Sequence, residues 1–174
     1  INEITKNRSF ILATGIQPEK DKRMKGSYLL TRFLAFYFLF TGKIKDEYTG
    51  DIDDLLEKTL TYLNMFPVIE LDKLENLVID LLEKAYKIAG KGVFRKKLNA
   101  SNPINMNIFE TTLYYIYLLG DKVNYCDKAL LYSELEKLIT NEEFIWSIED
   151  SRDGVAKVMF RFNMIKQFSE EIEL

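Results

Sequence analysis

Histidine is absent from this sequence of 174 residues, and its absence excludes several classes of catalytic site. Nucleases of the His-Asn-His type, phosphohydrolases of the His-Asp type, helical ribonucleases with an arginine–histidine pair, and serine or cysteine nucleophiles activated by histidine all need an imidazole ring. Zinc sites with mixed cysteine and histidine ligands need one as well. A catalytic site in this chain would therefore have to use clustered carboxylates or lysines.

Cysteine is almost absent, since Cys126 is the only one in the chain. A single cysteine forms no intrachain disulfide, which is typical of a reducing compartment, and we interpret Cys126 as a small buried or half-buried thiol. A basic stretch followed by an apolar run is also missing near the start, which argues against a signal peptide. These two observations lead us to expect a cytoplasmic chain. Because the sequence opens on Ile1 instead of methionine, we also expect it to be the C-terminal fragment of a longer protein.

The sequence has no apolar run long enough to cross a membrane. Residues 28–40 form its most apolar segment, but this is shorter than the ~20 residues that a bilayer requires, and Thr31 and Arg32 interrupt it. We expect a central core helix there and no membrane partner. The net charge of −3 gives no overall attraction to nucleic acid, while 47% hydrophobic and 29% charged residues are typical of a folded globular domain.

A helical periodicity of apolar residues is the dominant pattern of the sequence. Apolar residues recur at three and four positions along 71–88, Asp72 and Glu75 have the spacing of a capping box at its start, and Gly90 stands at its expected C-cap. Further helices are predicted at 1–13, 28–40, 52–63, 108–119, 129–139, a short segment after Asn141, and 155–172 with Asp153 before it. Only 93–98 could be a strand, and its basic residues crowd instead of alternating. The prediction is an all-α, irregular bundle of seven to nine helices around 28–40, forming one domain over 1–174.

Two polar connections carry clustered positive charge. Residues 91–107 contain no acidic residue, and Arg95, Lys96 and Lys97 follow one another there. This is not a phosphate-binding loop of the Walker type, because the lysines precede Leu98 and not a serine or threonine. Two interpretations stay open: a solvated connection after a helix C-cap, or a contact with DNA phosphates through locally raised potential.

The second basic group lies in the connection 15–26. Its cations, Lys20, Lys22, Arg23 and Lys25, are diluted by the acidic residues at 19 and 21. This segment is either a solvated loop or, if it shares a face with the first group, part of a nucleic-acid footprint. The sequence alone does not place the two groups relative to each other.

Two arginines fall in apolar helices. Arg32 lies within 28–40, and Arg161 stands between two phenylalanines. An unpaired buried guanidinium is costly, so we predict a structural ion pair for each. The acidic groups at 51–54 and 142–143 fall in predicted first helical turns, where negative charge favours the helix dipole. No set of acidic ligands converges from separate helices, so we predict no catalytic residue, no metal and no cofactor.

Three stretches together resemble a known family. Residues 21–25 (DKRMK) run into 32–37 (RFLAFY); 93–95 (VFR) are followed by 102–105 (NPIN) and 108–110 (IFE); and 143–145 (EFI) are followed by 158–162 (VMFRF). Their order and spacing resemble the helical C-terminal half of the ParB/sulfiredoxin-like proteins related to the GmrS part of the GmrSD type IV restriction systems. The likeness covers about 10–168.

The resemblance has specific functional implications. In that family the NTP-dependent, nuclease-like chemistry belongs to an N-terminal domain with an Asp-Gly-Gln-Gln-Arg loop, and a separate His-Asn-His-type domain of the fused or partner subunit cleaves DNA. Neither motif occurs here, so no catalytic residue carries over. The resemblance therefore implies a non-catalytic module that packs against the ParB-like domain and helps it close over DNA or a nuclease subunit. The alternative is an interaction or homo-oligomerisation module without a nucleic-acid role.

Overall fold

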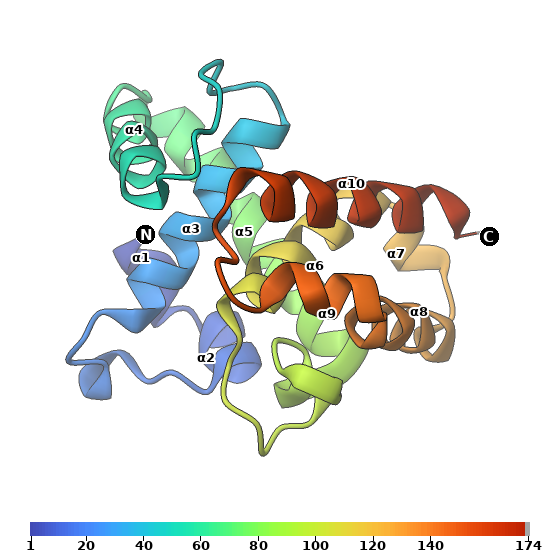
Figure 1. Ribbon diagram of the computed structural model, residues 1–174. Helices are drawn as coiled ribbons and strands as arrows, with labels where there is room; N and C mark the ends of the chain where they lie inside the picture. Colours follow the sequence, from blue (N-terminus) through green and yellow to red (C-terminus); the bar gives the residue numbers. More distant parts are fainter. Residues whose placement is uncertain (173–174) are drawn as a thin grey trace.

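The computed structural model describes residues 1–172 and confirms the all-α class (Figure 1). Residues 173 and 174, the end of the predicted domain, lie outside the described residues. The ten α-helices of the described part are α1 (Asn2–Lys6), α2 (Arg8–Thr14), α3 (Lys25–Phe40), α4 (Ile52–Asn64), α5 (Val68–Ala89), α6 (Met106–Leu119), α7 (Lys122–Tyr125), α8 (Lys128–Thr140), α9 (Glu142–Ile148) and α10 (Val155–Glu171). Three short 3-10 turns join them: η1 (Pro18–Lys20), η2 (Gly90–Gly92) and η3 (Lys96–Leu98).

The predicted central helix is confirmed as α3. Its sequence is apolar on almost every side, and the structure accordingly surrounds it, with α4 and α6 packed against it. The helix α6 is equally apolar and packs on α5 and α10 as well as α3. Figure 1 shows α3 and α6 in the middle of the molecule, with α10 crossing one side. Polar residues in the middle of α3 and in α6, such as Arg32 and Glu110, are therefore placed in the core.

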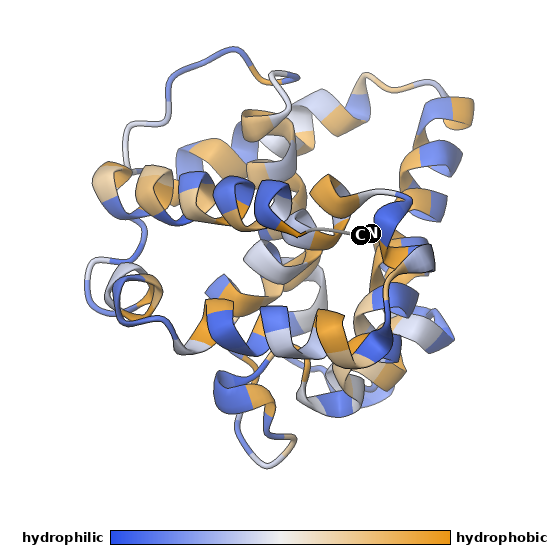
Figure 2. Ribbon diagram, turned by 90° about the vertical axis from the view of Figure 1, so that its right-hand side faces the viewer, coloured by the Kyte–Doolittle hydropathy of each residue, from blue (hydrophilic) through white to orange (hydrophobic). Residues whose placement is uncertain are grey.

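The outer helices are amphipathic, and Figure 2 shows hydrophobic and hydrophilic residues alternating along them. On α5 the predicted stripe is buried from Leu74 to Ile88, whereas Leu71 at its start is exposed. No helix among residues 1–172 is both long enough and apolar enough to cross a bilayer. The segment 93–98 is not a strand, because the described residues contain only one isolated bridge, between Arg95 and Ile104.

The N-terminus of α5 lies one turn earlier than predicted. The helix starts after Pro67, whose carbonyl oxygen accepts from the amide of Leu71 at 3.2 Å. Asp72 and Glu75 therefore lie inside the helix, and their assignment as a capping box was wrong. Proline lacks an amide hydrogen, but its carbonyl oxygen can accept the first hydrogen bond of a helix. Pro67 therefore marks the helix start here, and the capping-box spacing does not.

The predicted N-terminal helix also differs from the structure. The N-terminal segment is two helices and not one, because the side chain of Asn7 accepts from the amide of Ser9 at 2.8 Å and starts α2. The last helix begins at Val155 as predicted, and Gly154 occupies its N-cap position without a side-chain bond. The side chain of Asp153 is used elsewhere, in the site described next.

Candidate functional site

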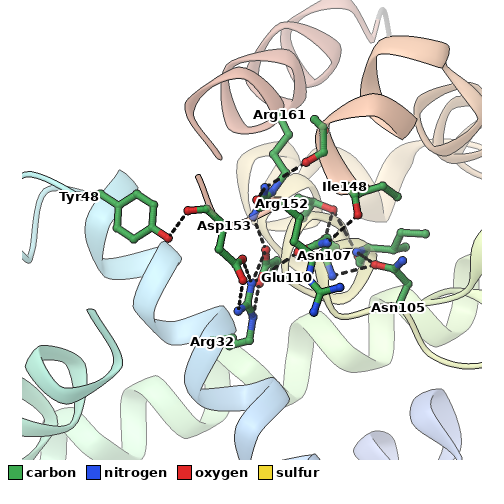
Figure 3. A network of polar contacts seen from close by, with 12 residues as sticks. Arg32, Tyr48, Asn105, Asn107, Glu110, Ile148, Arg152, Asp153 and Arg161 are labelled. Atoms are coloured by element: carbon green, nitrogen blue, oxygen red, sulfur yellow. Dashed lines mark hydrogen bonds and ion pairs between the residues drawn. The ribbon is translucent and has the colours of Figure 1, made fainter. Parts of the chain in front are cut away.

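Four charged side chains form a network where α3, α6 and α10 meet (Figure 3). Glu110 of α6 lies between two arginines: its Oε2 accepts from Nε of Arg32 at 3.1 Å, and its Oε1 accepts from Nη2 of Arg161 at 2.9 Å. Arg32 also donates through Nη2 to Oδ1 of Asp153 at 2.7 Å. Elements more than 120 positions apart in sequence are thus joined by ion pairs.

This network is almost closed to solvent. The side chains of Arg161 and Glu110 have no exposed surface, Arg32 is 1% exposed, and Asp153 is 26% exposed. Burial alone would lower the pKa of Arg32, but the carboxylates of Glu110 and Asp153 outweigh it and raise that pKa well above its ordinary value. Two positive and two negative charges cancel, so the desolvated ions are compensated by one another.

The same network fixes the backbone before α10. Arg161 donates to the carbonyl oxygen of Arg152, and the hydroxyl of Tyr48 donates to the carbonyl oxygen of Asp153 at 2.6 Å. Nearby, Nδ2 of Asn107 donates to the carbonyl oxygen of Ile148 at 3.2 Å. Backbone groups of 148–153 that would otherwise be unpaired at the edge of the core are satisfied in this way.

The network also brings together the three stretches that carry the family resemblance. Arg32, Glu110 and Arg161 come one from each stretch. The rings of Phe94 and Phe109, both in the second stretch, pack with their centroids 4.6 Å apart. The motif residues that lie in this network therefore hold the fold together.

Sequence reasoning identified the two arginines but not their partners. Glu110 is the only charged residue of α6, and a lone carboxylate in such an apolar helix is the signal that could have identified it. Asp153 was noted only as a residue before the last helix, which begins two residues later at Val155. The pairing across three helices follows only from tertiary packing.

Arg95 is placed differently from the prediction. It is 8% exposed, its Nη2 donates to the carbonyl oxygen of Thr14 at 2.7 Å, and its Nη1 donates to the carbonyl oxygen of Lys91. Burial lowers the pKa of Arg95. The guanidinium thus joins the C-terminus of α2 to η2, so Arg95, a predicted DNA-phosphate contact, is buried with both terminal nitrogens bonded to backbone carbonyls.

The other candidate cations lie on the surface. Lys97 is exposed, while Lys96 pairs with Glu149 through atoms 3.1 Å apart. In the other segment, Lys22, Arg23 and Lys25 are all exposed. Within residues 1–172 none of these last three, nor Lys97, makes an ion pair.

The bond between Arg95 and Thr14 relates the two basic segments. The first leaves α2 immediately after Thr14, and Lys96 and Lys97 follow Arg95 directly. The acidic Asp21 is withdrawn from the first segment, because its carboxylate accepts from the amides of Lys25 and Gly26 and caps α3. Both segments lie in the lower part of Figure 1, below α3.

Two further features of the structure concern metal binding and the single cysteine. Among the described residues no three potential ligands of the types histidine, cysteine, aspartate and glutamate cluster. Cys126 is half-buried beside a cavity of about 540 Å³ between α5 and the α7–α8 connection, which Lys84, Lys87 and Lys128 line.

Comparisons with protein-family models, with curated proteins and with solved structures found no match to this chain.

Proposed function

We propose that this chain is a non-catalytic helical module that braces a neighbouring domain. Following the resemblance, that neighbour is the ParB-like, NTPase- and nuclease-like N-terminal domain of a prokaryotic restriction protein that acts on modified DNA in the cytoplasm. The observation that supports the bracing role is the buried network: Arg32, Glu110 and Arg161, one charged residue from each of the three stretches, are held in the core, and Asp153 completes the balance of charge. Groups that are held in this way fix the positions of the helices relative to one another and do not reach a substrate.

The non-catalytic part of this proposal has a direct test. The purified chain is incubated with nucleoside triphosphates and with single- and double-stranded oligonucleotides, with and without divalent metal ions. We expect hydrolysis no faster than in buffer. Turnover that follows the protein through successive purification steps would refute the proposal.

A DNA contact is the second part of the proposal, and the placement of the basic segments favours it. Lys22, Arg23, Lys25 and Lys97 are exposed cations without acidic partners, on two segments joined through Arg95. Clustered cations of this kind bind phosphates by releasing counterions, whatever the total charge of the chain. DNA of any sequence would bind in the same way, because phosphate contacts carry no base information.

The DNA contact is tested by the salt dependence of binding to a fluorescent duplex. Changing these four cations to glutamine should weaken binding at low salt and reduce the slope of log K against log salt by roughly 3–4, about 0.9 per contact. The matched control changes four exposed lysines elsewhere, Lys45, Lys87, Lys128 and Lys166, to glutamine and keeps the same net charge. Equal losses in both variants, or no binding at low salt, would exclude the DNA contact.

An interaction module without a nucleic-acid role is the alternative function. It is favoured by the turn between α4 and α5, where Met65, Val68 and Ile69 are 72%, 73% and 63% exposed. Apolar side chains that are exposed next to one another are typical of protein-binding surfaces, whereas single exposed apolar residues are ordinary. Two results together would contradict this alternative: salt-dependent binding of the chain to the DNA duplex, and a molecular mass from light scattering that corresponds to a monomer.

A further inference from the structure

The cavity beside Cys126, between α5 and the α7–α8 connection, has a basic lining. Lys84 and Lys87 reach it from the C-terminal half of α5, and Lys128 reaches it from the first turn of α8. None of the described residues that line it is an aspartate or a glutamate. Its volume of about 540 Å³ lies within the range of small-molecule sites, roughly 300–1,000 Å³.

The carboxylates next to this cavity are engaged in other contacts. Oδ2 of Asp80 pairs with Nζ of Lys84 at 2.7 Å. Asp127, directly before Lys128, accepts from two amides of the first turn of α8 and caps that helix. Lys87 and Lys128 make no ion pair within the part of the chain that the structure describes. The cavity therefore presents two uncompensated cations, and a third that is shared with Asp80.

The lining is also partly apolar. Ile88 is buried, and Tyr86 and Val123 are half-buried. The thiol of Cys126 is half-buried and packs against the core. An apolar group of a ligand is favourably removed from water against such a surface, while the cations hold its charged end. The lining thus suits a molecule that has a small apolar body and a strongly negative end.

A buried donor without a partner lies close to Cys126. The side chain of Tyr115 on α6 is 1% exposed, and its hydroxyl has no hydrogen-bond partner among the described residues. Burial raises the pKa of Tyr115, and Glu134 and Cys126 raise it further, so this hydroxyl lies near the thiol that lines the cavity. Buried hydroxyls are nearly always paired, so an unpaired one favours a further polar group at this end of the cavity.

We propose that this cavity binds a small phosphate monoester, with the phosphate beside Lys87 and Lys128 and an apolar group against Tyr86 and Val123. A dianionic phosphate matches the two uncompensated cations, whereas inorganic phosphate alone would leave the apolar lining uncovered. The bound molecule would bridge α5, α7 and α8. This inference is independent of the proposed function, because it involves neither the buried network nor the two basic segments.

The experiment uses the full chain and three probes. Naphthyl phosphate has both the dianion and the apolar ring, inorganic phosphate has only the charge, and naphthol has only the ring. Because Cys126 is the only cysteine, its alkylation by the neutral reagent iodoacetamide, followed by mass spectrometry, reports on this cavity. We expect half protection by naphthyl phosphate on the order of 1 mM, typical of a ligand of this size, and roughly tenfold weaker protection by the other two.

Two-dimensional NMR of the isotope-labelled protein locates the bound probe without relying on the thiol. Naphthyl phosphate should shift amide signals of α5, α7 and the first turn of α8. None of the residues of α7 is buried, so a ligand that bridges this connection should also slow its hydrogen exchange, by at least about threefold at saturation.

Variants separate the cavity from the rest of the surface. Lys87→Gln with Lys128→Gln should raise the half-protecting concentration of naphthyl phosphate roughly tenfold and leave that of naphthol unchanged. The matched control, Lys45→Gln with Lys166→Gln, changes exposed lysines of other segments and alters the net charge equally. It should leave protection by naphthyl phosphate unchanged.

Three results would overturn the inference: no protection by naphthyl phosphate at about 10 mM, equal protection by all three probes, or equal losses in the two double variants. NMR shifts confined to elements other than α5, α7 and α8 would overturn it as well. None of these results bears on the hydrolysis test or on the four cations changed in the DNA titration, so failure of this site is distinguishable from failure of the proposed function.

Discussion

Glu110 has an unusual position, because one carboxylate contacts two guanidinium groups that are both removed from water. Each of its oxygens accepts from a different arginine, Oε2 from Arg32 and Oε1 from Arg161. Taking each ion out of water costs several kcal/mol, and only the pairing and its hydrogen bonds offset that cost. The net stability gained by the intact network is therefore small, whereas the loss of one member is expensive.

Glu110→Gln tests this asymmetry. The amide keeps the shape of the side chain but removes its charge, so two buried cations would share only the carboxylate of Asp153. We expect a loss of about 3–5 kcal/mol in the free energy of unfolding, measured by urea denaturation. The control Glu136→Gln, on the exposed side of α8, should change it by no more than about 0.5 kcal/mol. A loss below about 1 kcal/mol for Glu110→Gln would show that solvent compensates the arginines.

The hydroxyl of Tyr48 makes the free energy of unfolding depend on pH in the alkaline range. Burial and then the neighbouring Asp153 raise the pKa of Tyr48 from 10.0 to about 12, and its hydroxyl donates to the Asp153 carbonyl. Because the folded pKa lies above the unfolded one, the stability due to this group is complete below pH 10 and is lost as pH rises to about 12.

Tyr48→Phe should therefore be less stable than the wild type by about 1 kcal/mol at neutral pH, through the lost hydrogen bond. Between pH 10 and about 12 its stability should fall less steeply, so that the two curves converge. Urea midpoints over this range, with tyrosinate absorbance as a titration record, measure both effects. Parallel curves would contradict the assigned pKa shift of Tyr48.

Residue types in the interior could be predicted from sequence, but their partners could not. A guanidinium inside an apolar helix requires a counter-charge, and that rule alone was enough to predict ion pairs for Arg32 and Arg161. The partner Glu110 lies 78 positions from Arg32 and 51 from Arg161, and local periodicity carries no information at that range. Exposure was equally unpredictable: Arg95 and Lys96 are adjacent cations in the same connection, yet Arg95 is buried against Thr14 and Lys96 is exposed.

At the scale of elements, the connection between α5 and α6 has the most constrained backbone. Lys97 and Leu98 both have left-handed conformations, with φ of 59° and 47°, and the turn presses the carbonyl of Leu98 against Gly92. A Cβ at position 92 would overlap that carbonyl. Gly42, in contrast, has a left-handed φ of 70° but open space around its Cβ position.

The two glycines therefore predict two different costs. Gly92→Ala must displace backbone and should lower the free energy of unfolding by roughly 3 kcal/mol or more. Gly42→Ala meets only the conformational penalty of the left-handed region and should cost about 1 kcal/mol. Urea denaturation followed by circular dichroism compares them. Equal losses would mean that the turn at Leu98 moves aside freely.

The existence of helices could be predicted more reliably than their ends. Residues 28–40 and 108–119 were expected as apolar helices, and both are present because burial on all sides needs no particular register. The structure extends the second to Met106, capped by Asn105, whose side chain accepts from the amide of Asn107 at 2.9 Å. This start was not predicted, although asparagine is a favoured N-cap residue, because the apolar run becomes continuous only at Ile108.

For the whole molecule, the buried network predicts how the fold comes apart. It connects α3, α6, α10 and the loop at Asp153, which span most of the chain, so one break exposes several buried charges together. This is the physical basis for expecting one domain over 1–174. Peripheral parts have no such tie: α7, for example, has only four residues and none of them is buried.

Unfolding should accordingly be a single cooperative transition, with the same urea midpoint by tryptophan fluorescence and by circular dichroism. Native-state hydrogen exchange should show the slowest amides in α3, α6 and α10 at one common free energy, and fast local opening in α7. In Glu110→Gln the protection of all three slow helices should fall by the same amount, because they lose the same shared contact. If α10 instead exchanged at its own lower free energy in the wild type, the network would be a local brace and the chain would consist of more than one cooperative unit.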